Sequence, residues 1–202
     1  MNQIIKNTII LFVITLVAGI CLGTVHDITL DPIAQAQEAA ATKTYQEVYP
    51  DAASFDEPQE LADAVTAAAD SISEWGFGKV TINDAKEALD ASGNQIGYLI
   101  TSTSAESYGG NVQIAVGITN EGELTGIGFL SISDTPGLGM RAKEPDFKDQ
   151  FIGKKAENLE VTKTGASADN QIQAISGATI TSKAVTNATD AAIYFVANCL
   201  AQ

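Results

Sequence analysis

An apolar segment near the N-terminus limits what this chain can fold into more than any other feature. Residues 8–25 carry no charged side chain, Lys6 precedes them, and Asp27 and Asp31 follow. A helix of this length extends about 27 Å, close to the thickness of the bilayer core. The positive flank predicts that the N-terminus is cytoplasmic. We therefore expect a single-pass anchor in the cell (inner) membrane, with residues 1–7 cytoplasmic and the rest of the chain extracytoplasmic.

Two other interpretations of this segment remain open. Ala34-Gln35-Ala36 resembles a small-x-small signal-peptide cleavage site, but it lies well beyond an apolar run that is long for a signal peptide. Cys21 raises a lipoprotein alternative, and Ile20 before it is larger than the residue usual at that position. The uncleaved anchor is therefore the favoured interpretation.

Composition excludes several classes of function. The 202 residues include 11 basic and 25 acidic side chains, for a net charge of −14. The lack of a basic run argues against a nucleic-acid groove, and the acidity also disfavours anionic lipid surfaces. Solubility is the simplest explanation of the acidic charge. One histidine, His26, and two cysteines, Cys21 and Cys199, provide no pattern of metal ligands.

The segments after the anchor predict a linker, a helix and then strands. Residues 26–56 are expected to form a stalk or linker, and residues 57–92 to contain a helix and the first strands of a soluble domain. Apolar positions at helical spacing after Pro58 predict a helix over residues 57–73. Residues 79–82 and 86–91 predict two short strands.

The central part of the chain predicts antiparallel strands. Val112, Ile114, Val116 and Ile118 alternate strictly with other residues, which is typical of a strand. Another strand is expected within residues 95–103, and a return strand over residues 124–132. The turns at residues 92–94 and 120–122 are too short for parallel crossovers, so the pairing should be antiparallel.

A C-terminal helix is expected to cover this sheet. Val185, Ala188, Ala192, Phe195 and Cys199 recur at spacings of three and four. A sheet needs a partner on its apolar face, and this helix can supply it. The predicted fold class is therefore α+β: an N-terminal transmembrane helix, then one extracytoplasmic domain with a mostly antiparallel sheet covered by helices. A short helix over residues 144–151 and a strand over 159–164 complete the expected elements.

The segment before the C-terminal helix, Ser176-Gly177-Ala178-Thr179-Ile180-Thr181-Ser182, combines small residues with four hydroxyls. Ser and Thr at such a position predict a helix N-cap. A helix N-terminus can also bind phosphate, because its free N–H groups and dipole favour an anion. Judged by spacing alone, a simple cap is the more common outcome.

This segment resembles the flavinylation motif of the FMN-binding domain family. That family includes the G subunit of Rnf-type electron transport complexes and the C subunit of the sodium-pumping NADH:quinone reductase. The last Thr of its motif carries FMN through a phosphoester, and this residue corresponds to Thr179 here. The resemblance implies covalent FMN at Thr179, and thus a phosphoprotein, with an FMN-binding domain at residues 93–200. The residues expected around the phosphate are Ser176, Gly177, Ala178, Thr181 and Ser182.

A second motif, Thr135-Pro136-Gly137-Leu138-Gly139, resembles a loop of the same family that approaches the flavin. The resemblance implies flavin contacts from Thr135, Gly137, Leu138 and Gly139, with Leu138 as an apolar neighbour of the ring. Asp134 before the loop is interpreted as a cap of the turn. The family often has Asp three residues before the motif Ser, where this chain has Gln173.

The resemblance implies an electron-transfer subunit of an ion-translocating ferredoxin:NAD oxidoreductase, coupled to Na⁺ or H⁺. Its partners would be the other membrane and peripheral subunits, and a flavin transferase would be needed for maturation. Ferredoxin and NAD would act indirectly, since no Gly-x-Gly-x-x-Gly follows a predicted strand. No catalytic triad or paired carboxylates are apparent, so no side chain is assigned a catalytic role.

Three alternatives to this function are kept. Two remain in the family: a component like the C subunit of the quinone reductase, and a free-standing extracellular flavoprotein. The third belongs to another class, an anchored binding or adhesion module without redox chemistry in which the motif is only a helix cap.

Overall fold

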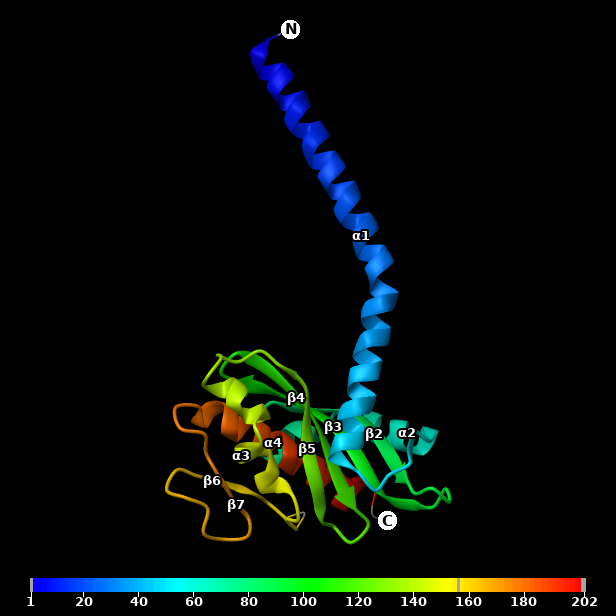
Figure 1. Ribbon diagram of the computed structural model, residues 1–202, viewed down its shortest axis with the longest axis vertical. Helices are drawn as coiled ribbons and strands as arrows, with labels where there is room; N and C mark the ends of the chain where they lie inside the picture. Colours follow the sequence, from blue (N-terminus) through cyan, green and yellow to red (C-terminus); the bar gives the residue numbers. More distant parts are fainter. Residues whose placement is uncertain (1, 156, 201–202) are drawn as a thin grey trace. The chain divides into compact units, whose positions relative to one another are not determined.

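The computed structural model describes residues 2–155 and 157–200 and forms two compact units, Met1–Thr42 and Lys43–Gln202. Helix α1 (Gln3–Val48) makes up nearly all of the first unit and continues into the second (Figure 1). The predicted anchor and most of the expected stalk are thus one helix. Within the described residues it is the one helix long and apolar enough to cross a membrane, and its apolar side chains are exposed.

The hydroxyl groups in the apolar part of α1 are satisfied inside the helix. Thr8, Thr15 and Thr24 each donate a hydrogen bond to the carbonyl four residues earlier, at 2.8–3.0 Å. In a bilayer core a polar group without a partner is costly, so this bonding is what a lipid-exposed helix requires.

The second unit is built on a five-stranded antiparallel sheet in the order β1-β2-β3-β4-β5. The strands are β1 (Ser54–Asp56), β2 (Val80–Leu89), β3 (Gln95–Ser107), β4 (Gly110–Thr119) and β5 (Leu124–Ile132). The antiparallel sheet is therefore confirmed. The two short strands predicted in residues 79–91 were wrong, because both belong to β2. A register shift between Ile82 and Asp84 interrupts the alternation there, and the sequence pattern breaks at the same point.

Two helices of the domain are shorter than their sequence patterns. Helix α2 (Gln59–Ala68) and the 3₁₀ turn η1 (Ile72–Trp75) replace the single helix predicted over residues 57–73. The helix ends because the Ala68 carbonyl accepts hydrogen bonds from both the N–H and the hydroxyl of Ser71. The predicted helix over residues 144–151 is split in the same way into α3 (Pro145–Lys148) and η3 (Asp149–Phe151).

A second sheet was not predicted. Strands β6 (Glu160–Thr162) and β7 (Gln171–Gln173) pair in parallel. Three-residue strands are too short to show a period of two, which explains why β7 was missed and β6 was predicted too long. The chain then passes into α4 (Thr179–Phe195) and the short π-helix η4 (Val196–Leu200).

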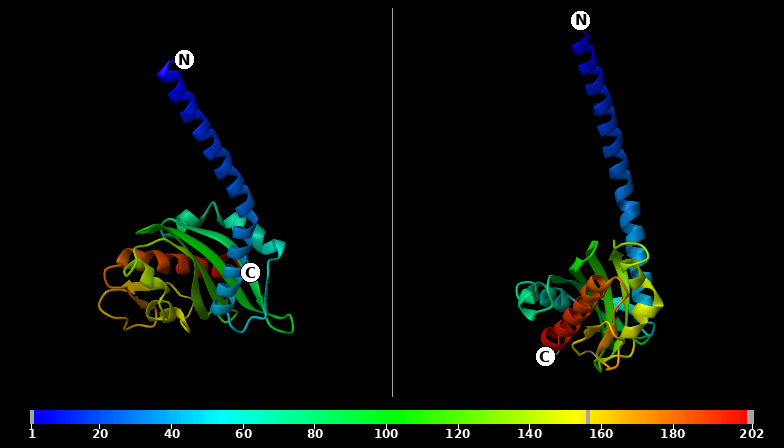
Figure 2. Two further views of the ribbon diagram at one scale, coloured as in Figure 1. Left: turned by 45° about the horizontal axis from the view of Figure 1, so that its top comes forward. Right: turned by 90° about the vertical axis from the view of Figure 1, so that its left-hand side faces the viewer.

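Helix α4 covers one face of the large sheet, as predicted. Ile100, Ile114 and Val116 are fully buried in the same cluster as Ala188 and Phe195. In both orientations of Figure 2 this helix, orange to red, lies across the green strands. Ser102 Oγ of β3 also donates to the Ala188 carbonyl at 2.9 Å. Each such apolar side chain stabilises the fold by about 1.5–3 kcal/mol, so this layer fixes α4 on the sheet.

The opposite face of the sheet is covered by the last residues of α1 and the residue that follows it. Side chains added at Gly97, Gly117 and Gly128, on three adjacent strands, would collide with Thr44, Val48 or Tyr49. These glycines leave the space that residues 44–49 occupy. Two hydrogen bonds complete the contact: Thr125 Oγ1 donates to the Val48 carbonyl at 2.7 Å, and the Tyr49 hydroxyl donates to the Ile96 carbonyl at 2.8 Å. A glycine in a strand usually indicates a weak strand and not a packing surface. The three glycines therefore did not predict that a second element covers this face.

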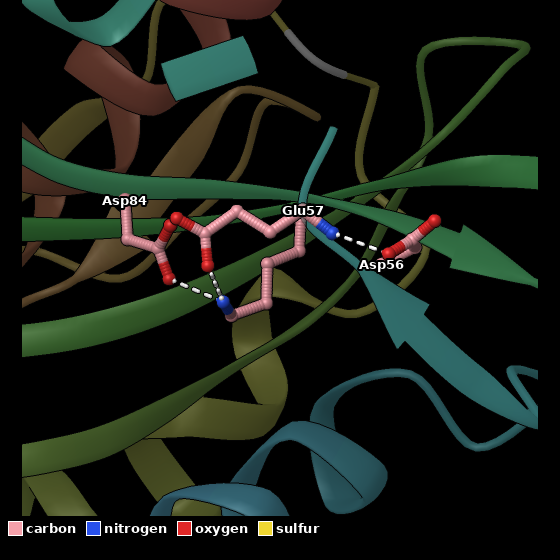
Figure 3. Close-up of polar contacts among 4 residues, drawn as sticks. Asp56, Glu57 and Asp84 are labelled. Atoms are coloured by element: carbon pink, nitrogen blue, oxygen red, sulfur yellow. Dashed lines mark hydrogen bonds and ion pairs between the residues drawn. The ribbon is translucent and has the colours of Figure 1, made fainter. Parts of the chain in front are cut away.

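An ion-pair cluster joins the end of β1 to β2. Figure 3 shows the carboxylates of Glu57 and Asp84 converging on one ammonium group, which is Lys86 Nζ at 2.6 and 2.9 Å. The hydrogen bond from Lys86 lowers the pKa of Glu57. Burial lowers the pKa of Lys86, but its bonds to the two carboxylates outweigh this effect and the net pKa is raised. The cluster holds the short edge strand to its neighbour.

A buried carboxyl group lies within α4. Asp190 is 3% exposed, and its Oδ1 accepts the Leu159 N–H at 2.8 Å. Burial raises the pKa of Asp190 from an ordinary 3.8 to about 7, although the Leu159 hydrogen bond opposes this shift. The folded protein therefore keeps this proton to a higher pH than the unfolded chain does.

This shift predicts a specific pH dependence of stability. The stabilisation from protonated Asp190 is complete below pH 4 and is lost as the pH rises through 7. Asp190→Asn accepts the same N–H and does not titrate. Between pH 4 and 8, the free energy of unfolding of the wild type should therefore fall by roughly 2–4 kcal/mol relative to that of Asp190→Asn. Denaturant unfolding of the detergent-solubilised protein at several pH values measures this, and a constant difference would contradict it.

Candidate functional site

A cleft of about 480 Å³ opens where three segments meet: the β3–β4 turn, the loop after β5 and the start of α4. This volume is within the usual range of small-molecule sites. The residues that line it are Tyr108, Thr135, Leu138, Gly139, Gly177, Ala178, Thr179, Ile180 and Thr181. Seven of the ten residues predicted around a flavin are in this lining; Ser176, Gly137 and Ser182 are not.

The N-terminus of α4 is not capped by a hydroxyl, so the predicted Ser/Thr cap was wrong. The N-cap residue is Ala178, which makes no side-chain capping bond. The nearby Ser182 Oγ is used elsewhere, because it accepts the Ile175 N–H and donates to the Ala178 carbonyl, both at 3.0 Å. Within the described chain, the N–H groups of residues 179–181 have no hydrogen-bond acceptor. These free donors at a helix N-terminus favour an anion such as a phosphate.

Thr179 and Thr181 face different environments at this helix end. Thr179 is half-buried in the cleft wall, and in the described part of the chain its hydroxyl has no hydrogen-bond partner. Thr181 is fully buried, and its hydroxyl donates to Asp134 Oδ2. Thr181 and Ser182, both expected around the phosphate, therefore already use their hydroxyl protons in bonds within the protein. Of these three hydroxyls, that of Thr179 is the one left without a partner in the described part of the chain.

The two sequence motifs are in contact. A Cβ added to Gly177 would lie 3.2 Å from Leu138 Cδ2, and the positive φ of Gly177 (+78°) also favours glycine. Leu138 is 43% exposed, and its N–H donates to the Thr135 carbonyl at 3.1 Å. Leu138 therefore forms an apolar wall beside the helix start. Gln173, at the family's usual Asp position, pairs through its backbone with the Gln150 side chain.

Asp134 was interpreted as a turn cap, and the structure gives it a wider set of contacts. Its carboxylate is 5% exposed and accepts hydrogen bonds from Ser107 Oγ (2.7 Å), the Gly109 N–H and Thr181 Oγ1. These partners lie 25 to 47 residues away along the chain, so no local pattern could reveal them.

Tyr108 was also missed as a site residue. It is 72% exposed and lines the cleft from the β3–β4 turn. The signal available in sequence was an aromatic residue in a Tyr-Gly-Gly turn, a place where apolar side chains seldom contribute to a core. As for metals, the residues described here contain no group of three or more His, Cys, Asp or Glu arranged to bind an ion.

Family models match two parts of this chain. The model of the RnfG N-terminal region matches residues 1–48, and that of the FMN-binding domain matches residues 107–194. The G subunit of the Na⁺-translocating ferredoxin:NAD⁺ oxidoreductase complex of Acetobacterium woodii is 36% identical over 96% of this chain and 92% of its own length. The chain belongs to the family of Rnf-complex G subunits. The resemblance stated from the two motifs is thereby confirmed, and the FMN-binding match contains every residue that lines the cleft.

Another G subunit and parts of two solved structures are also similar to this chain. The G subunit of the proton-translocating ferredoxin:NAD⁺ oxidoreductase complex of Clostridium ljungdahlii is 30% identical over 95% of this chain and 91% of its own length. Among solved structures, the C subunit of the Na⁺-translocating NADH-quinone reductase from Parabacteroides distasonis has a TM-score of 0.49 at 24% identity, covering 58% of this chain and 63% of that one. NqrC of Shewanella oneidensis has a TM-score of 0.48 at 18% identity, covering 58% and 61%.

The close packing around Gly139 predicts that any side chain at this position destabilises the fold. An added Cβ would lie 2.6 Å from Asp134 Cβ and 2.7 Å from Thr181 Oγ1. Gly139→Ala should therefore lower the free energy of unfolding by about 1–3 kcal/mol, as overpacking does. Gly165→Ala is the control, because its Cβ meets nothing within 4 Å and only the backbone cost at φ +98° applies. Chemical denaturation of both variants tests this, and equal losses would contradict the steric explanation.

Proposed function

We propose that this protein is the membrane-anchored flavoprotein subunit of an ion-translocating ferredoxin:NAD⁺ oxidoreductase complex. It carries electrons on FMN joined by a phosphoester to Thr179. The observation that supports this most is the free Thr179 hydroxyl, half-buried in the cleft at an uncapped helix N-terminus. Membership of the Rnf G-subunit family and the FMN-binding match over this region support the same cofactor.

The start of α4 suits a phosphate attached at this position. In a phosphoester, Thr179 Oγ1 bonds to phosphorus, the bond from phosphorus to the leaving group of an activated FMN donor breaks, and the hydroxyl proton is released. The diester keeps one negative charge, which a helix N-terminus stabilises by roughly 0.3–1 kcal/mol when exposed and more when partly buried. The N–H groups of residues 179–181 can donate to its oxygens.

The cleft walls suit a flat, largely apolar ring. Tyr108, Leu138 and Ile180 are exposed apolar side chains that line it, at 72%, 43% and 54% exposure. An otherwise acidic domain has little reason to keep three such side chains at one opening. Bound FMN would supply the electron-transfer chemistry, so the chain needs to hold and orient the ring. A covalent tether also retains the flavin where no cytoplasmic pool could replace it.

The anchor gives the proposed location. Helix α1 would cross the cell membrane once with the N-terminus in the cytoplasm, leaving the FMN-binding domain on the extracytoplasmic side. The partners would be the other subunits of the complex, and a flavin transferase would attach the cofactor. Ferredoxin and NAD⁺ would exchange electrons with other subunits and would not bind this one directly.

The mass of the protein tests this attachment. Coexpressed with a flavin transferase, the wild type should retain one FMN, less one water, after denaturation. Thr179→Ala should lose this adduct completely, because the ester oxygen is gone. Thr164→Ala, an exposed loop threonine outside the cleft, should keep it.

The same measurement can overturn the proposal. If the wild type carries no adduct and shows no flavin absorption, the protein is not a covalent flavoprotein and an anchored binding module is favoured. If the adduct persists in Thr179→Ala, another hydroxyl carries the cofactor.

A further inference from the structure

We propose that Asp134 is a positioning residue that holds the three walls of the cleft in register, so that Thr179 and the flavin ring are presented together. The proposal rests on the FMN function proposed above. It concerns a carboxylate that does not itself line the cleft and lies behind its walls.

Each wall is bonded to this one carboxylate. Oδ1 accepts the Gly109 N–H, next to Tyr108 in the first wall. Oδ2 accepts the Ser107 hydroxyl at 2.7 Å, also from the β3–β4 turn, and the Thr181 hydroxyl from the start of α4. Asp134 itself begins the loop that carries Leu138. One side chain thus connects the walls that bear Tyr108, Leu138 and Thr179.

The neighbouring glycines show that the carboxylate occupies a space reserved for it. A Cβ at Gly109 would lie 2.6 Å from Asp134 Oδ1, and a Cβ at Gly139 would lie 2.6 Å from Asp134 Cβ. Neither glycine has a positive φ, so backbone conformation does not require glycine at either position. At Gly139 an added Cβ would meet Asp134 and Thr181, and at Gly109 it would meet Asp134 Oδ1 and, nearer still, the Ser133 carbonyl oxygen, so the close approach of Asp134 and its neighbours excludes a side chain on both sides.

The bond to Thr181 also holds the first turn of α4. Asp134 accepts a hydrogen bond from the Thr181 hydroxyl and fixes that side chain two residues after Thr179. The Thr179 hydroxyl remains free in the cleft wall. Without the carboxylate, the Gly109 N–H and the buried hydroxyls of Ser107 and Thr181 would lose their acceptor. The walls would then no longer be held to one another.

The first test needs no flavin. In the full-length Thr179→Ala protein, Asp134→Ala should speed exchange of the hydrogen-bonded amides in three segments, residues 107–110, 138–140 and 182–185, by about tenfold or more, the effect of one lost hydrogen bond. Asp190→Ala removes another buried carboxylate, one that bonds Leu159 outside the cleft, so it is the matched control. It should leave exchange in these three segments unchanged relative to the rest of the domain.

The second test uses the protein coexpressed with a flavin transferase. Asp134→Ala should lower the fraction carrying FMN by about tenfold and change the visible circular dichroism of the flavin that remains, because the ring loses its fixed walls. Asp134→Asn keeps the shape and the Oδ1 acceptor, and its amide nitrogen can donate to the Ser107 and Thr181 hydroxyls once these turn to accept, so it should restore most of the adduct and the wild-type spectrum. Asp190→Ala should match the wild type in both.

The two tests fail separately. If exchange in the three segments is the same in Asp134→Ala and Asp190→Ala, the positioning role is overturned, whether or not FMN is bound. If Asp134→Ala is fully flavinylated with an unchanged spectrum, it is overturned as well. A wild type without any adduct overturns the proposed function and with it the role of Asp134 toward FMN, even where the exchange result shows the walls to be coupled.

Discussion

The packing of α4 against the antiparallel sheet is the contact on which the rest of the structure depends. Fully buried residues such as Ile100 and Ile114 meet Ala188 and Phe195 of the helix, and their burial from water fixes the helix axis on the strands. Because the helix cannot shift, its first turn lies where the β3–β4 turn and the loop after β5 also end. The cleft is therefore a product of the core, and the position of the Thr179 hydroxyl is set by apolar contacts made elsewhere along the same helix.

Glycines distinguish the two faces of this sheet. One face carries branched side chains for α4, while Gly97, Gly117 and Gly128 on the other face admit the backbone and side chains of residues 44–49. Both faces of a thin sheet are thus covered, although the second cover is small. The buried Ser102 hydroxyl bonds across the layers to the Ala188 carbonyl, so this polar group of the core is satisfied.

Sequence predicted the features that depend on local periodicity and short motifs. The strict alternation in β4, the spacing in α4 and the two motifs were sufficient for the fold class and the family. Features set by distant contacts were not predictable: the bulge in β2 and the partners of Asp134 depend on residues far along the chain. The N-cap was mispredicted because α4 begins at Thr179, which places Ala178 at the cap position instead of a Ser or Thr, and helix boundaries are not fixed by composition.

The position of Thr179 has a consequence for how electrons would travel. If FMN is esterified to the first residue of this helix, its phosphate and ribityl chain tether the ring, so the ring can tilt and move within the reach of that chain but cannot shuttle between distant sites. Redox neighbours would have to come to the opening flanked by Tyr108, Leu138 and Ile180. The rate of electron transfer would then depend on how often those partners reach the opening. Blocking the opening would lower that rate without changing the redox properties of the flavin.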